Sequence, residues 1–152
     1  MQTLIENRQK RVKLDLRRIR RTVRNVLRYL GCRDQEISLL FVDNAAIAEI
    51  NLQYLKRDYP TNVISFSLRE GDFGHINPQL LGDIVISTEQ ALADARKGNL
   101  DLDDEIDFLV IHGLLHLLGY DHEGPDEREA AKMMDKEKEI FSLLKGFRID
   151  LP

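Results

Sequence analysis

Residues 112–122, HGLLHLLGYDH, constrain the fold most strongly, because three of the four histidines lie within these eleven residues. Residues four apart on a helix are separated by about 6 Å of rise and about 40° of rotation. His112 and His116 should therefore project from one face of a helix. Gly119 permits the left-handed conformation that ends a helix, and His122 follows three residues later. We expect a helix and then a turn that returns the third imidazole toward the first two.

Three imidazoles in this arrangement can share one metal ion and leave a fourth position open for water, as in catalytic zinc sites. The spacing is that of the metzincin pattern H-E-x-x-H-x-x-G-x-x-H, except that Gly113 replaces the glutamate base of a protease. A metal ion can activate water and polarise a phosphoryl oxygen without that glutamate. The sequence predicts zinc ligands at His112, His116 and His122, although nickel, copper or iron also accept imidazole.

The histidine cluster also allows two other interpretations. His112 or His116 could be a hydrogen-bonded core residue, or the metal could be structural rather than catalytic. Gly113 costs a helix about 1 kcal/mol relative to alanine, so we expect it to allow backbone or a ligand to approach closely. Asp121 is a candidate catalytic residue, either as a substitute base or as a partner that orients the third histidine.

Hydrophobic periodicity predicts an α+β fold in one domain, residues 1–152. Strand patterns occupy residues 3–6, 36–42, 62–68 and 81–87, and helical patterns occupy residues 13–30, 45–55, 88–97, 101–119 and 125–145. Asp43 or Asn44 could cap the second helix, and Ser87 with Gln90 forms a plausible capping box for the third. We expect a small mixed sheet of about four strands, with a hairpin-like pair around residues 70–79. Several helices should pack on it, including a metzincin-like metal helix.

Composition restricts the class of protein and its partners. No apolar run approaches the roughly 18–20 residues that span a bilayer, and the single cysteine cannot form an internal disulfide. We therefore expect a cytoplasmic protein without membrane contact. Residues 1–33 hold eleven Lys/Arg and two acids, whereas the rest holds eleven Lys/Arg and twenty-four acids. The basic N-terminal helix predicts an anionic partner, and a solvated helix face is the alternative.

Residues 112–122 also resemble the H-G-x-L-H-L-x-G-Y-D-H signature of the YbeY family of bacterial rRNA-maturation endoribonucleases. DYPTNVISF at residues 58–66 is similar to the family segment D-x-P-T-[DN]-V-L-S-F, and LGDIVIS at residues 81–87 is similar to its L-G-D-I strand. The resemblance implies a single α+β domain with a zinc-like ion on three histidines. It also implies metal-dependent cleavage of single-stranded RNA in 16S rRNA 3′-end maturation and ribosome quality control, with the small ribosomal subunit as partner.

The chain departs from the family pattern at one position. The arginine of the family segment Y-R-x-x-D, which the resemblance implies helps to hold the phosphate, is replaced by Leu55. Lys56 or Arg57 could take this role, and Arg57 is our candidate. Phe66 and Phe73 could stack on bases, although core packing is more typical of a residue such as Phe66.

Three functions follow from these observations. The leading prediction is a metal-dependent, single-strand-specific endoribonuclease. The second is a metzincin-like metallohydrolase of peptides or amides, which rests on the histidine spacing alone. The third is a ribosome assembly factor whose metal is structural, an alternative that the replacement at Leu55 supports.

Overall fold

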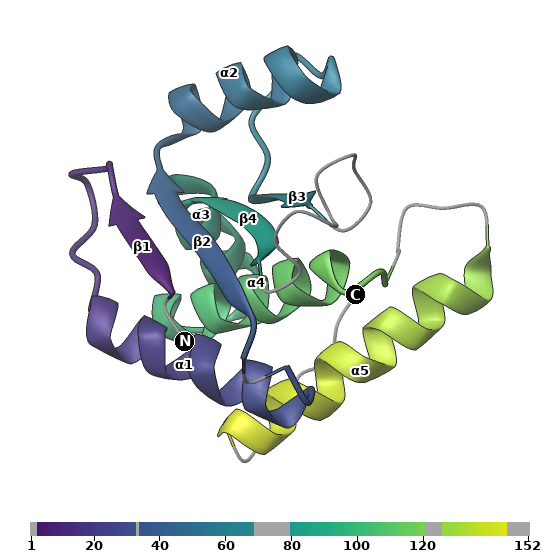
Figure 1. The fold of residues 1–152 in the computed structure, drawn as a ribbon. Coiled ribbons are helices and arrows are strands. Elements are labelled where there is room, and N and C mark those ends of the chain that lie inside the picture. The colour runs from purple at the N-terminus through teal and green to yellow at the C-terminus, as the bar shows by residue number, and fades with distance from the viewer. Residues whose placement is uncertain (1–2, 33, 69–79, 121–125, 146–152) are drawn as a thin grey trace.

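A computed structural model describes residues 3–32, 34–68, 80–120 and 126–145 (Figure 1). They form strands β1 (Leu4–Asn7), β2 (Glu36–Val42), β3 (Val63–Ser67) and β4 (Leu80–Ser87), and helices α1 (Leu16–Tyr29), α2 (Asn44–Leu55), α3 (Thr88–Gly98), α4 (Leu102–Leu117) and α5 (Glu127–Lys145). The sheet order is β1-β2-β4-β3, with β1, β2 and β4 parallel and β3 antiparallel to β4. The predicted α+β class, the mixed four-stranded sheet and the hairpin-like pair are confirmed.

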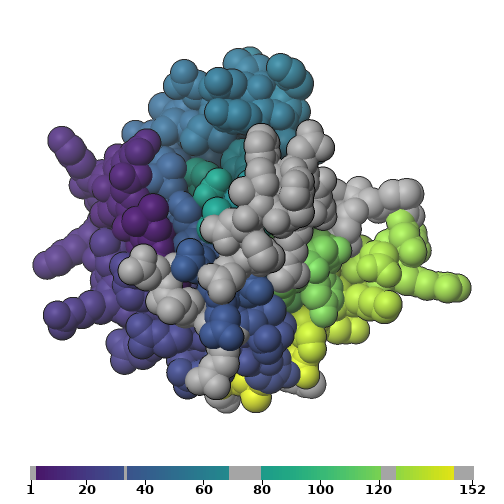
Figure 2. Space-filling model, viewed as in Figure 1, coloured from purple at the N-terminus to yellow at the C-terminus, as the bar shows by residue number. Residues whose placement is uncertain are grey.

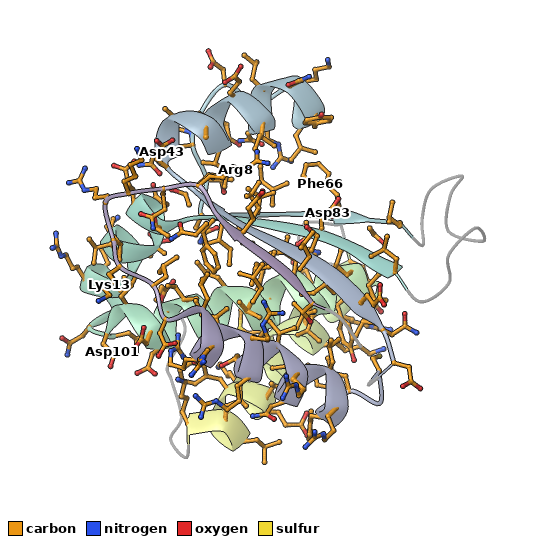
Figure 3. All side chains as sticks on the ribbon, turned by 60° about the vertical axis from the view of Figure 1, so that its left-hand side comes forward. Arg8, Lys13, Asp43, Phe66, Asp83 and Asp101 are labelled. Carbon is orange, nitrogen blue, oxygen red and sulfur yellow. The ribbon has the colours of Figure 1, made fainter. Side chains whose placement is uncertain are left out.

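The sheet separates two hydrophobic layers of unequal size, as Figure 3 shows from the side. Successive side chains of a strand point to opposite faces, so Leu39 and Phe41 of β2 are buried against α1, α3, α4 and α5. Val42 faces the other way and packs with Ile47 of α2. The helix α2 therefore covers one face and the remaining helices the other, which leaves β3 at the sheet edge between α2 and α4.

The helix α4 lies at the centre of the larger layer and is joined to α1 and α5 by ion pairs. Asp107 of α4 is almost completely buried. Its Oδ2 accepts a hydrogen bond of 2.7 Å from Arg18 of α1 and pairs with the ammonium group of Lys145 of α5. These contacts hold α1 and α5 at a set position along α4. No helix in the described parts of the chain has the length and apolarity needed to cross a bilayer.

Carboxylate caps fix where the first two helices begin. The Asp15 side chain accepts a hydrogen bond from the backbone N–H of Arg18 at 3.1 Å, so α1 begins at Leu16. The predicted start at residue 13 is therefore wrong, because a polar cap outweighs hydrophobic periodicity at a helix end. The Asp43 side chain caps α2 through the N–H of Ala46 at 2.8 Å, which decides between the two predicted caps.

The capping of α3 agrees only in part with the prediction. The Ser87 hydroxyl accepts a hydrogen bond from the Gln90 N–H at 3.3 Å, as expected. The reciprocal bond of a capping box is absent, however, because the Ser87 N–H donates to the carbonyl of Asn62 at 2.9 Å, while Gln90 Nε2 donates to Asp94 at 3.2 Å. The helix also includes Gly98, where an earlier end was predicted, and Asn99 takes the left-handed conformation with φ of 57°.

Candidate active site

The two histidines of α4 lie one turn apart, as their spacing predicts. The ring centroids of His112 and His116 are 4.8 Å apart and the ring planes meet at 74°. Two imidazoles on one tetrahedral ion, each with a metal–nitrogen distance of about 2.1 Å, have centroids roughly 5 Å apart, so this pair fits a shared metal. The predicted ligand His122 and the predicted catalytic residue Asp121 lie outside the described residues. Within the described residues, no three His, Cys, Asp or Glu side chains could hold a metal ion.

The turn after α4 has the geometry predicted from Gly119. Its φ is +100°, which glycine adopts without the steric penalty of a side chain. The N–H of Gly119 donates to the carbonyl of His116 at 3.0 Å, and the N–H of Tyr120 donates to the carbonyl of Leu115 at 3.0 Å. These two bonds form a Schellman motif. They fix the direction in which the chain leaves the histidine pair.

Glu137 of α5 is a site residue that sequence reasoning missed. Its side chain is 5% exposed, and its Oε1 contacts Nδ1 of His112. An ionised carboxylate only accepts hydrogen bonds, so a neutral His112 in this contact carries its proton on Nδ1 and its lone pair on Nε2, on the side of the ring away from Glu137. A carboxylate behind a histidine in this way is the usual support of a metal-binding imidazole. No spacing rule could have found it, because the two residues lie 25 apart on different helices.

Gly113 allows α4 to pack directly on β4. A Cβ atom at this position would lie 2.9 Å from Cγ2 and 3.0 Å from Cδ1 of Ile84. The Ser65 hydroxyl of β3 donates to the Gly113 carbonyl at 3.4 Å, which ties the same turn to the edge strand. Gly113 does allow a close approach, but the approaching group is the side chain of Ile84 and not backbone or a ligand. The packing leaves no room for the glutamate that a zinc protease carries here.

A pocket of about 260 Å³ connects the histidine pair with the end of α2. Its described lining consists of Asn51, Leu55, Arg57, Thr61, Asn62, Val63, Ile64, Ser65, His112 and His116. Among these lining residues, Arg57 alone carries a permanent positive charge, and none of them has a carboxylate. The described lining therefore carries a net positive charge beside the two imidazoles.

Arg57 and Lys56 differ in their placement. Lys56 takes the left-handed conformation with φ of 60° at the end of α2, and its N–H donates to the carbonyl of Leu52 at 3.1 Å. The N–H of Arg57 donates to the carbonyl of Asn51 at 3.2 Å. After this turn Arg57 lines the pocket together with Leu55, whereas Lys56 does not. The structure thus brings the candidate Arg57 to the histidine pair.

Phe66 belongs to the smaller hydrophobic layer. It is half-buried, packs against the cluster around Ile47, and makes an edge-type contact with Tyr54 at 5.5 Å between ring centroids. Of the two predicted roles, core packing is the one that the structure supports for Phe66. Phe73 lies outside the described residues.

Fold and pocket together define a small α+β protein whose central helix carries paired histidines into a cationic pocket at the sheet edge. A model of the family described as Endoribonuclease YbeY matches residues 4–145. The chain therefore belongs to the endoribonuclease YbeY family, as the sequence motifs indicated.

Individual relatives agree along almost the whole chain. Endoribonuclease YbeY of Syntrophus aciditrophicus is 58% identical over 150 residues, which cover 99% of this chain and 94% of the relative. Endoribonuclease YbeY of Geobacter sulfurreducens is 44% identical over 146 residues, with coverage of 96% and 97%. The solution structure of TM1509 from Thermotoga maritima matches with a TM-score of 0.67 at 28% identity and covers 95% of this chain and 90% of that chain.

Proposed function

We propose that this protein is an endoribonuclease that cleaves single-stranded RNA in rRNA processing, with roles in 16S rRNA 3′-end maturation and ribosome quality control. Family membership supports the endoribonuclease activity. The observation that carries the proposal is the presence of His112, His116 and Arg57 in one pocket without a described carboxylate. Two imidazoles suit a metal ion and a guanidinium suits a phosphate, so both can act on the same phosphodiester.

The proposal includes one zinc ion held by His112, His116 and His122. The separation of the first two rings supports this assignment, as does the buried carboxylate of Glu137 behind Nδ1 of His112. When bound, the ion supplies Lewis acidity toward a phosphoryl oxygen and lowers the pKa of water. Glu137 keeps the His112 ring in one orientation and one tautomer, so that Nε2 is available as a ligand.

Arg57 and Asp121 complete the proposed catalytic set. The guanidinium of Arg57 offers planar paired donors that match two oxygens of a phosphate. Arg57 thereby serves the function of the family arginine, whose position in this chain is occupied by Leu55. Asp121 precedes the third histidine in the sequence and is assigned the role of base or of orienting partner. Neither role requires a carboxylate at position 113, where a Cβ atom would lie 2.9 Å from the Ile84 side chain.

The decisive experiment compares His116→Ala with His75→Ala, because His75 is the one histidine outside residues 112–122. The purified protein should cleave a single-stranded RNA, the His116 variant should be inactive, and the His75 variant should keep most of the activity. Chelation should abolish cleavage, and zinc should restore it. Equal activity of the His116 variant and the unmodified protein would refute the proposal.

We also propose the small ribosomal subunit as partner, with α1 as a contact surface for rRNA. Arg17, Arg21, Arg24 and Arg28 are exposed on α1 and form no ion pair with any described residue. Side chains of the N-terminal part of the chain project from the surface in Figure 2. Phosphate contacts of this kind release counterions, so binding should weaken steeply with salt.

An assembly factor with a structural metal is distinguished from the nuclease by complementation. In a strain that lacks this protein, the His116→Ala variant should fail to restore rRNA 3′ ends if cleavage is the function. Normal 3′ ends with this variant would instead favour the assembly factor. The amount of the variant in the cells must equal that of the unmodified protein, which immunoblotting checks.

Hydrolysis of peptides or amides is a second candidate because of the position of β3. No described strand pairs with the outer edge of β3, and residues 63–65 of this strand line the pocket. An extended peptide could add to such an edge by main-chain hydrogen bonds. A peptide library incubated with the zinc-loaded protein tests this function, and an absence of turnover would remove its support.

A further inference from the structure

Four exposed side chains at the end of α2 form what we call the 52–59 patch: Leu52, Tyr54, Leu55 and Tyr59. We propose that this patch is a stacking site for nucleobases of single-stranded RNA, an inference that rests on the proposed function. Eight large hydrophobic side chains are exposed in the described residues, and half of them belong to the patch, with exposed fractions of 47%, 62%, 42% and 53% in the order given. Around α2, Leu55 points between the directions of Leu52 and Tyr54, which differ by about 160°, so the exposed apolar groups form a band around the end of the helix.

The patch is continuous with the candidate active site. Leu55 is both exposed in the patch and part of the pocket lining, where it lies with Arg57 and the two histidines. A polynucleotide with one phosphate beside Arg57 would therefore have its neighbouring nucleotides over the patch. The described lining of the pocket contains no carboxylate, and Asp58 is the one acid among residues 52–59.

One hydrogen bond and one ring contact hold the patch in place. The Asn51 side chain is 1% exposed, and its Nδ2 donates to the carbonyl of Tyr59 at 2.8 Å. The ring of Tyr54 contacts Phe66, which packs in the smaller hydrophobic layer. Rigid aromatic side chains lose little conformational entropy on binding. The two tyrosines are thus prearranged for contact, and their exposed rings can be replaced without opening the core.

Aromatic side chains next to cations favour single-stranded nucleic acid over other occupants. Residues 52–59, LQYLKRDY, hold two tyrosines, Lys56 and Arg57 with a single acid, Asp58. Proteins that bind single strands combine stacking on aromatic rings with cations that follow the backbone. The bases of a duplex are paired and stacked, so their faces are not available to such a surface. The chemistry of the patch accordingly selects unpaired RNA for the adjoining pocket.

The test uses the full-length protein and two short single-stranded oligonucleotides of equal length and charge, one with normal bases and one abasic. Fluorescence anisotropy measures their affinities for the unmodified protein and for Tyr54→Leu/Tyr59→Leu. The matched control Leu143→Ala removes another exposed side chain, on α5. The double variant should bind the normal strand at least about tenfold more weakly, since one stacked base contributes about 1–3 kcal/mol. Tyr54→Phe/Tyr59→Phe and the control should bind within about twofold of the unmodified protein by the same stacking argument. The abasic strand should bind weakly to every variant.

Equal affinity of the leucine variant and the unmodified protein for the normal strand would overturn the proposal. A loss of self-association in the leucine variant, without a change in RNA affinity, would assign the patch to a second copy of the chain. Cleavage activity distinguishes this proposal from the proposed function. Base-dependent binding without cleavage would contradict the proposed nuclease activity and support the stacking site. Cleavage of RNA by a protein whose leucine variant binds RNA with unchanged affinity would support the nuclease activity and contradict the stacking site.

Discussion

Replacing Gly113 with alanine should destabilise the protein, although the same change stabilises an ordinary helix. Alanine is preferred over glycine in a helix interior by about 1 kcal/mol. At this position the new methyl group would meet three carbon atoms of Ile84, at 2.9, 3.0 and 3.2 Å. Overpacking of this kind costs about 1–3 kcal/mol. We therefore expect a net loss of about 1 kcal/mol in the free energy of unfolding.

The sign of the effect should reverse when Ile84 is made smaller. In an Ile84→Ala background the contacting carbons are absent, so Gly113→Ala should stabilise by about 1 kcal/mol. Ile84→Val removes only Cδ1 and should give an intermediate result. Urea unfolding of the single and double variants measures the coupling between the two positions. Stabilisation by Gly113→Ala in the unmodified background would refute the argument that contact with β4 requires this glycine.

The same variant links packing to activity. A displacement of α4 away from β4 moves His112 and His116 relative to Arg57, which is held by the end of α2 on the other side of β3. Catalytic groups tolerate little displacement. The cleavage rate of Gly113→Ala should therefore fall, and the Ile84→Val background should recover part of it. An unchanged rate would show that the position of the histidine pair does not depend on this contact.

Three further predictions concern buried carboxylates. Glu137→Gln should lower metal affinity about 10- to 100-fold by weakening the support of His112, and metal analysis after dialysis measures this with exposed Glu139→Gln as the control. Burial and the nearby Asp94 raise the pKa of Glu105 from 4.5 to about 7. Between these pH values the folded protein binds more protons than the unfolded chain, so the free energy of unfolding should fall as pH rises from 4.5 to 7. Urea unfolding should show a smaller fall in Glu105→Gln, and equal slopes would contradict the assignment. Asp107→Ala should cost about 1–3 kcal/mol in thermal or urea unfolding. Arg18 and Lys145 lose their shared partner, and each keeps a second carboxylate, Asp103 at 3.5 Å and Asp104 at 2.9 Å.

Much of the fold follows from local sequence patterns. The strand bounds of β2 and the course of α2 and α4 agree with prediction because hydrophobic periodicity depends only on residues within a few positions of one another. Helix ends were less predictable. The start of α1 at Leu16 and the end of α3 at Gly98 depend on which of several polar groups or left-handed residues terminates the helix. That competition is decided by small energy differences, which packing against neighbouring elements can reverse.

The sequence by itself determined the candidate site's central feature. Two histidines four residues apart must share a helix face, and Gly119 provides the turn that ends that helix, because both effects act within one or two turns. Only the tertiary structure decided that Glu137 stands behind His112 and that Arg57 reaches the same pocket. Glu137 and His112 come from two helices on the same face of the sheet, whereas Arg57 follows α2, which covers the other face. These contacts depend on how α2, α4 and α5 pack against one another. This packing is driven by hydrophobic burial, which is non-directional, so a local sequence pattern does not indicate which polar side chains will meet.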